Sequence, residues 1–174
     1  EDTFQELLGV ADQGDTIVDG GNSNCRDSQR RHSRAAERGL FFIDAGGSGG
    51  VWGLEVGYCL MTGGAEEPVR RLEPIFKALA PDNGYAHVGP PGAGHFVKMV
   101  HNGIEYGLMQ AYAEGFEVMR ASEFGLDLHE IAGIWRYGSV VRSWLLELLH
   151  AAFEHEGSDL GDIRGYVEDS GEGR

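Results

Sequence analysis

The sequence predicts an α/β region followed by an all-α region. Short apolar runs rich in β-branched residues alternate with stretches of helical periodicity over the first half of the chain. Glycines and prolines then cluster between residues 84 and 94, and only helical periodicity follows. We therefore place a domain boundary near Gly92, with an α/β domain over 1–92 and the beginning of a helical domain over 93–174.

Each element of the first half is predicted from its own residues. Four short runs rich in β-branched or aromatic residues predict strands: TIVDGG (16–21), LFFIDAGG (40–47), VGYCLM (56–61) and YAHVG (85–89). Amphipathic or charged spacing predicts helices over 3–12, 25–38 and 65–80, the last interrupted by Pro68 and Pro74. This order is typical of a parallel sheet with helices on its faces.

Helical periodicity continues through the second half. Three helices are predicted there, over 94–121, 127–136 and 141–155, before a polar, glycine-rich end. Gly103, Gly107 and Ala111 recur at one-turn spacing in the first of these helices. A glycine inside a helix costs about 1 kcal/mol relative to alanine, so this small-residue side indicates that another segment packs closely there.

The composition excludes several classes of protein. A net charge of −14 opposes nucleic acid binding, which requires a basic surface. No apolar run approaches the ~18 residues that span a bilayer, and no basic and apolar leader opens the chain, so neither a membrane nor a secreted protein is expected. Cys25 and Cys59 are too few for a disulfide framework, and no histidine grouping matches a recognised metal-ligand spacing. We expect a cytoplasmic protein without a metal site.

The segment GHFVKMVHNGIEYGL (94–108) places polar side chains on one face of an otherwise apolar helix. At about 100° per residue, this face collects Lys98, His101, Asn102, Glu105 and Tyr106. Lys98 and Glu105 lie within about 20° of each other and roughly 10.5 Å apart along the axis, which is too far for a salt bridge across one turn. The spacing suits two side chains that converge on one small substrate.

Burial would give Lys98 and Glu105 complementary chemistry. An apolar environment lowers the pKa of a lysine and raises that of a glutamate, so the pair is suited to act as general base and general acid. The alternative is a solvated face that Lys98 and Glu105 merely decorate. Apolar residues that continue the same face favour burial: Met109, Tyr112 and Phe116.

Glycine-rich loops follow two of the predicted strands, DGGNS (19–23) and DAGGSGG (44–50). The crevice beyond the carboxyl ends of parallel strands is where ligands bind, and glycines let backbone N–H groups approach an anion. Asn22 or Ser23 could instead cap the next helix, and Ser48 could serve a tight turn. Two such loops on neighbouring strand ends favour a shared binding site.

Several motifs together resemble one enzyme family. GPPGAGHFVKMVHN (89–102) resembles the catalytic pattern of the β-hydroxyacid dehydrogenases, and HNGIEY (101–106) is similar to the version found in decarboxylating 6-phosphogluconate dehydrogenases. DGGNS (19–23), SGG (48–50) and YVEDSGEGR (166–174) follow in the family's order and spacing. The resemblance covers essentially the whole chain.

This resemblance implies roles for individual residues. Lys98 would take the proton of the C3 hydroxyl as hydride leaves for the nicotinamide, and Glu105 would protonate C1 of the enediol that remains after decarboxylation. The residues that would hold the sugar acid are Asn22, Ser48, Gly49, Gly50, His101 and Asn102, with Asn22 also near the cofactor. Tyr106 and Arg174 would contact the phosphate, the arginine at a position where many family members have lysine.

The implied fold is part of a doubly wound, Rossmann-like dinucleotide-binding domain plus the start of the helical domain. The implied reaction is oxidative decarboxylation of 6-phosphogluconate to ribulose 5-phosphate and CO2, in the pentose phosphate pathway, with reduction of NADP or NAD by a homo-oligomer (dimer or tetramer). Residues 48–64 are similar to the shorter-chain branch of the family, which includes enzymes that prefer NAD.

Two alternatives stay open. One is a β-hydroxyacid dehydrogenase that acts on an unphosphorylated acid, against which HNGIEY argues. The other is a non-catalytic piece that only folds, binds a partner or dimerises. No G-x-G-x-x-G string occurs in the sequence, so the phosphate-binding turn of a dinucleotide domain is absent from it. We therefore expect a middle segment of such an enzyme that is inactive by itself.

Overall fold

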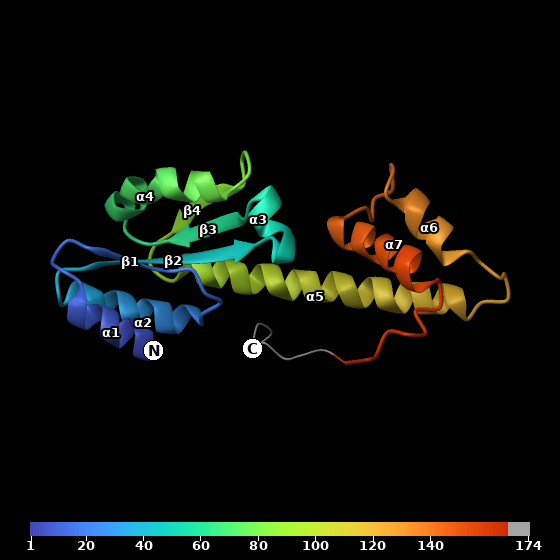
Figure 1. Ribbon diagram of the computed structural model, residues 1–174, viewed down its shortest axis with the longest axis horizontal. Coiled ribbons are helices and arrows are strands. Elements are labelled where there is room, and N and C mark those ends of the chain that lie inside the picture. The colour runs from blue at the N-terminus through green and yellow to red at the C-terminus, as the bar shows by residue number, and fades with distance from the viewer. Residues whose placement is uncertain (167–174) are drawn as a thin grey trace. The chain divides into compact units, whose positions relative to one another are not determined.

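The computed structural model describes residues 1–166, which form two compact units, Glu1–His101 and the part of Asn102–Arg174 within that range (Figure 1). The division falls inside the long helix α5 (Ala93–Arg120). The domain boundary predicted near Gly92 stays a prediction. Over residues 1–166, no helix combines the length and the hydropathy that a membrane span requires.

A four-stranded sheet organises the first unit. Its strands follow the order β1-β2-β3-β4. Their bounds are β1 Thr16–Asp19, β2 Phe41–Ser48, β3 Cys59–Gly63 and β4 Tyr85–Gly89. The β1/β2 and β3/β4 pairs are parallel, but β2 and β3 are antiparallel. The fold is therefore α/β with a mixed sheet, where the sequence predicted a wholly parallel one.

The short connection between β2 and β3 explains the antiparallel pair. A parallel crossover needs a dozen or more residues, and only 49–58 join these strands. The connection holds a 3-10 turn, η1 (Gly50–Trp52), and one turn of helix, α3 (Gly53–Val56). Gly57 ends α3 at φ +86°, a conformation that favours glycine. The strand predicted over 56–61 therefore begins later than expected, at Cys59.

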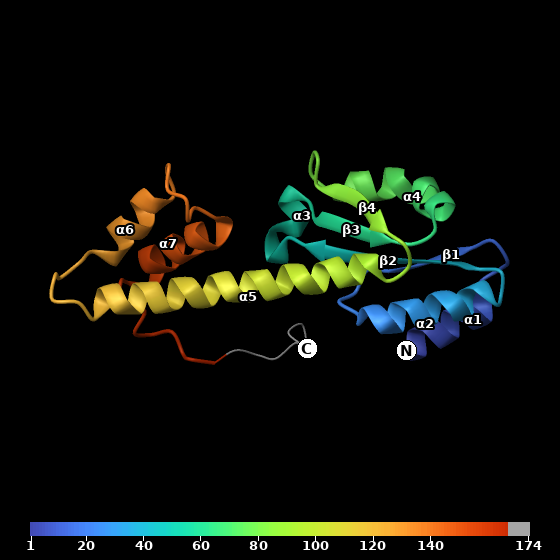
Figure 2. The same ribbon diagram turned by 180° about the vertical axis from the view of Figure 1, so that it is seen from behind.

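Helices cover both faces of this sheet. Helices α1 (Asp2–Val10) and α2 (Cys25–Ala36) lie on one face together with the first turns of α5, and α4 (Glu66–Leu79) lies on the other (Figures 1 and 2). Successive residues of β2 point to opposite faces. Phe42 accordingly packs in the core with α1 and α2, and Ile43 packs in the core with α4.

Helix α4 is continuous, so the interruptions predicted at Pro68 and Pro74 do not occur. Pro68 lies in the first turn, where backbone N–H groups have no partner within the helix. Pro74 lies in the interior, where a proline removes one backbone hydrogen bond. Pro74 and Arg70, whose carbonyl would have accepted that bond, are both exposed, so solvent can satisfy the carbonyl.

The second unit is helical. It contains the second part of α5, α6 (Leu128–Trp135) and α7 (Trp144–Glu156). The side chains of Asp127 and Ser143 cap α6 and α7 by accepting backbone N–H groups of Glu130 (2.9 Å) and Leu146 (3.1 Å). Its buried core contains Phe116, Leu128, Ala132, Leu146 and Phe153.

Candidate active site

The carboxylate of Asp44 fixes the start of α5 to the sheet. Asp44 lies in β2 and is fully buried. Its Oδ1 accepts the N–H of Gly92 at 2.7 Å, and its Oδ2 accepts the N–H of His95 at 2.9 Å. A negative charge at a helix N-terminus satisfies N–H groups that lack a partner within the helix and interacts favourably with the helix dipole. One carboxylate thus determines where α5 begins relative to β2.

Two glycines let α5 lie directly on the strands. A Cβ added at Gly94 would lie 2.5 Å from the carbonyl oxygens of Asp44 and Met61. A Cβ added at Gly46 would lie 2.5 Å from the Cβ of Lys98. Only residues without a side chain fit at these two positions, so the helix and the strand are in backbone contact.

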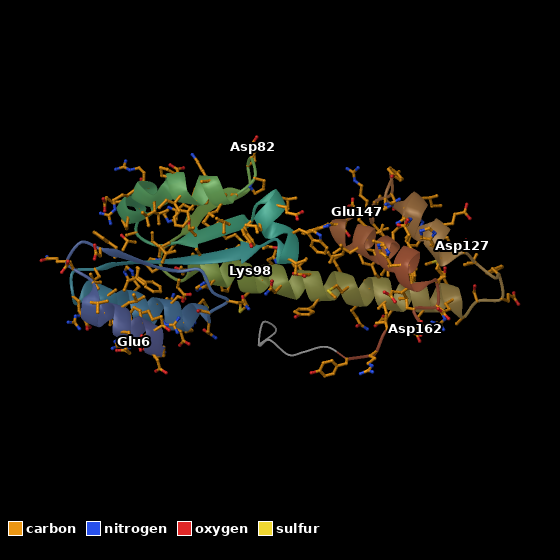
Figure 3. All side chains as sticks on the ribbon, viewed as in Figure 1. Glu6, Asp82, Lys98, Asp127, Glu147 and Asp162 are labelled. Carbon is orange, nitrogen blue, oxygen red and sulfur yellow. The ribbon has the colours of Figure 1, made fainter. Side chains whose placement is uncertain are left out.

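This contact places Lys98 beside the carboxyl end of β2. Alternate residues of a strand share one face, so Asp44, Gly46 and Ser48 all lie on the face that α5 covers. The stem of Lys98 lies over Gly46, and Ser48 is the next residue along that face. Figure 3 marks Lys98 on α5 next to the sheet. The structure therefore brings Lys98 and Ser48 to one side of β2.

The loop after Ser48 is made of glycines. Gly49 precedes η1, and its added Cβ would lie 3.1 Å from the ring of Tyr58. Gly50 has φ +56°, in the left-handed region that glycine adopts at little cost. The backbone therefore turns sharply beyond Ser48, at the strand end where a ligand was predicted to bind.

The remaining polar residues of the predicted site continue along α5. His101 is half-buried at the end of the first unit. In the second unit Asn102 is buried, Glu105 is half-buried and Tyr106 is exposed. Because α5 is one continuous helix, Lys98 and Glu105 keep the helical spacing predicted from the sequence.

The small-residue side of α5 is more open than the sequence predicted. An added Cβ at Gly103 or Gly107 would meet no heavy atom within 4 Å among the described residues, so the predicted close packing at this small-residue side is wrong for the chain as described. Three apolar residues of the same helix are exposed as well: Val100, Ile104 and Leu108. This part of α5 therefore presents apolar surface.

Asp19 organises the loop that presents Asn22. Its carboxylate accepts the backbone N–H of Gly21 at 3.0 Å and the hydroxyl of Ser23 at 2.8 Å, and it pairs with Arg31 at 2.8 Å. Desolvation raises the pKa of Asp19, but these hydrogen bonds and its electrostatic interactions with His95 and Arg31 lower it more, so the pKa lies below its ordinary value. Asn22 is exposed at the loop tip.

The residue that caps α2 is Asn24, whose side chain accepts the N–H of Arg26 at 2.9 Å. The alternative roles considered for Asn22 and Ser23 as caps are therefore wrong. Ser23 instead bonds to Asp19, and Asn22 is left exposed beside the end of β1.

A buried hydrogen bond joins α2 to α5. The hydroxyl of Ser28 and Nδ1 of His95 lie 2.7 Å apart, and both side chains are buried. Within the described residues, Nε2 of His95 has no hydrogen-bond partner. Sequence reasoning did not assign supporting roles to Asp19, Asp44 or His95. The signal that could have found Asp44 is an acid inside the apolar run FFIDAGG, because a buried carboxylate needs partners.

Arg174 and nearly all of the YVEDSGEGR motif lie outside the described residues. The proposed phosphate contact of Arg174 therefore stays a prediction.

The first unit has a mixed sheet with glycine-rich loops at its strand ends, and the helix that follows carries a lysine over the sheet. These features define the class as a Rossmann-like dinucleotide-binding fold joined to a helical region. Residues 1–89 match the sequence family described as the NAD binding domain of 6-phosphogluconate dehydrogenase, and residues 94–123 match that enzyme's C-terminal domain. The chain belongs to the 6-phosphogluconate dehydrogenase family.

Individual relatives agree with this assignment. The chain is 48% identical over 167 residues to the NAD(+)-dependent, decarboxylating 6-phosphogluconate dehydrogenase of Haloferax volcanii, covering 95% of this chain and 54% of that protein. It is 38% identical over 166 residues to the NADP(+)-dependent enzyme of Bacillus subtilis, covering 91% of this chain and 35% of that one. The chain thus spans about half, or less, of the length of these relatives.

A solved structure of Plasmodium falciparum 6-phosphogluconate dehydrogenase has the same fold over this region. The TM-score is 0.89 at 28% sequence identity, and the match covers 99% of this chain and 39% of that one. That enzyme was solved in its apo form, with NADP+ and with 6-phosphogluconate.

Proposed function

We propose that residues 1–174 form the central part of an NAD- or NADP-dependent enzyme that oxidatively decarboxylates 6-phosphogluconate to ribulose 5-phosphate and CO2. The observation that carries the proposal is the contact between Gly46 and Lys98, which holds the lysine stem at the carboxyl end of β2 on the same face as Ser48. Ligands of open α/β sheets bind beyond this end.

Lys98 is proposed as the base for the first step. Its amine takes the proton of the C3 hydroxyl, which allows hydride to leave C3 for the nicotinamide. When bound, the dinucleotide supplies the oxidant for this step. The same lysine then returns a proton to the C3 oxygen while C1 is lost as CO2 and an enediol forms.

Glu105 is proposed as the acid for the last step, in which it protonates the carbon that becomes C1 of ribulose 5-phosphate. The neighbouring hydroxyl, which carries the former C3 oxygen, returns its proton to the Lys98 amine and becomes the C2 ketone. Positioned donors and acceptors hold the sugar acid during both steps. They are Asn22, Ser48, Gly49, Gly50, His101 and Asn102, with Tyr106 and Arg174 at the phosphate.

The loop 19–23 fits the approach of a nucleotide. An added Cβ at Gly20 would meet no heavy atom within 4 Å among the described residues, and Asp19 holds the loop so that Asn22 is exposed beside the strand end. The sequence carries no G-x-G-x-x-G turn for the pyrophosphate. These residues would therefore supply only part of the cofactor site, with Asn22 near the cofactor.

The proposal extends to location and assembly. We place the enzyme in the cytoplasm and expect a homo-oligomer, either a dimer or a tetramer. The exposed apolar residues of α5, which include Val100, Ile104 and Leu108, support assembly because such surface is stabilised when a partner covers it. The negative net charge argues against a nucleic acid partner.

Two proteins test this proposal. The first is the purified 174-residue chain, and the second is a chimera in which the flanking segments of the Haloferax volcanii relative complete residues 1–174. We expect turnover of 6-phosphogluconate with NAD or NADP by the chimera and none by the chain alone. A folded chimera that oxidises an unphosphorylated β-hydroxyacid as fast as 6-phosphogluconate would contradict the substrate assignment. Turnover by the 174-residue chain alone would contradict the inference that these residues supply only part of the cofactor site.

A further inference from the structure

Three metal-ligating side chains gather between α6 and α7, within the second unit. His129 comes from the first turn of α6, and His150 and Glu154 lie one turn apart on α7. Each side chain offers one ligand atom, and these three atoms all lie within 4.8 Å of one another. No step of the proposed reaction uses these residues.

The packing of the two helices favours this gathering. The rings of His129 and His150 are stacked, with centroids 4.3 Å apart and planes inclined by 28°. An added Cβ at Gly133 would lie 3.2 Å from Nε2 of His150, so the glycine leaves room for that ring against α6. The α6 residue that faces the ring is therefore the smallest one available.

The histidine on α6 has an unused ligand atom. Nε2 of His129 is buried, and within the described residues it has no hydrogen-bond partner. A buried polar atom without a partner is costly, and such atoms are uncommon in native structures. A bound cation would accept the lone pair of this nitrogen when its proton resides on Nδ1.

We propose that His129, His150 and Glu154 bind one divalent transition-metal ion, of which Zn²⁺ is the reference probe, and that this ion links α6 to α7. Two imidazoles and one carboxylate are a known zinc ligand set that leaves a fourth position for water. Ligand atoms around a tetrahedral Zn²⁺ at about 2.0–2.2 Å lie roughly 3.3–3.6 Å apart. The three ligand atoms are near enough to share one ion, but the rings of His129 and His150 must turn out of their present stack, in which the planes are inclined by 28°, so that a nitrogen of each points at the metal.

The charged residues around the cluster influence its affinity for a cation. Glu154 contributes one negative charge, while Arg136, at the end of α6, is close enough to interact electrostatically with His150. A guanidinium near a cation weakens its binding. Removing the charge of Arg136 is therefore expected to strengthen the site.

Isothermal titration calorimetry of the chelator-treated 174-residue chain with Zn²⁺ tests the proposal. We expect one equivalent to bind, and we expect His129→Gln, His150→Gln and Glu154→Gln each to weaken binding by at least about tenfold, since changes even to second-shell partners cost 10–100-fold. His155→Gln is the matched control, because His155 is an exposed histidine of the same helix outside the cluster and should leave the affinity unchanged.

Glu154→Gln keeps the test decisive if a histidine variant unfolds, because Glu154 is exposed and its change leaves the core intact. Far-ultraviolet circular dichroism verifies the folding of each variant. Arg136→Gln should bind Zn²⁺ more tightly than the parent chain. The proposal is overturned if the parent chain binds no Zn²⁺, if folded Glu154→Gln binds it as tightly as the parent, or if His155→Gln weakens binding as much as the cluster variants do.

Discussion

Asp44 in β2 accepts the backbone N–H of His95 in α5 at 2.9 Å, although the two residues are 51 positions apart in the sequence. The same carboxylate accepts the N–H of Gly92 at 2.7 Å. This pair of bonds makes a strand residue the cap of the helix that carries Lys98. The position of the proposed base relative to the sheet therefore depends on a residue that takes no part in the chemistry.

Replacing Asp44 with asparagine should lower the free energy of unfolding by about 2–3 kcal/mol, since an amide leaves one of the two N–H groups without an acceptor in a buried site. Urea unfolding measures the loss. Asp82→Asn is the control, because Asp82 lies exposed in the turn before β4 and its change should stay within about 0.5 kcal/mol (Figure 3). Equal stability of the Asp44 variant and the parent would refute the capping role.

Alanine substitutions at two glycines of α5 should change the stability of the chain in opposite directions. Gly94→Ala places a Cβ 2.5 Å from two backbone carbonyl oxygens, so we expect destabilisation of about 2–3 kcal/mol. Gly103→Ala meets no heavy atom within 4 Å among the described residues and should stabilise the chain by up to about 1 kcal/mol through helix propensity. Thermal unfolding of both variants checks this, and destabilisation by Gly103→Ala would reveal a packing contact at that side of α5.

The stability contributed by Asp19 should depend on pH. The pKa of this carboxyl is lower in the folded chain than its ordinary value of 3.8, so its stabilisation is present above that value and is lost as the pH falls through the folded pKa. Asp19→Asn should therefore cost about 1–2 kcal/mol at pH 7 and progressively less below pH ~4. Urea unfolding across this range measures the difference from the parent.

The matching control for that series is Asp12→Asn, since Asp12 is exposed between α1 and β1. It should leave the shape of the pH profile unchanged. A constant stability difference for Asp19→Asn from pH 7 to pH 2 would show that the carboxylate charge contributes nothing there.

Replacing Lys98 and replacing Glu105 should block different steps of the proposed reaction. In the chimera, Lys98→Met removes the acceptor of the first proton, so no reduced nicotinamide should form. Glu105→Gln leaves that acceptor in place, but the glutamine amide cannot donate a proton to C1. A first-turnover burst of reduced nicotinamide should therefore survive while steady-state turnover falls by about 10²–10⁴-fold. Stopped-flow absorbance of the reduced nicotinamide distinguishes the two. Equal loss of the burst in both variants would show that the roles are assigned incorrectly.

The sequence alone determined the kinds of element and most of their positions. Periodicity is a local property, so strands at Thr16–Asp19 and Tyr85–Gly89 and the helix Ala93–Arg120 were predicted to within a few residues. The shared face of Lys98 and Glu105 also follows from local geometry, because helical spacing depends only on residue number. The family resemblance rested on contiguous motifs and was confirmed by the match of residues 1–89.

Tertiary structure decided what depends on residues that are distant in sequence. The antiparallel pairing of β2 and β3 and the cap that Asp44 provides for α5 are contacts between separate elements, and no local pattern specifies them. The grouping of His129 with His150 arises in the same way, from the packing of two helices around Gly133. Spacing rules for metal ligands did not reveal it, because they describe ligands near one another in the chain, whereas side-chain packing brings these two histidines together.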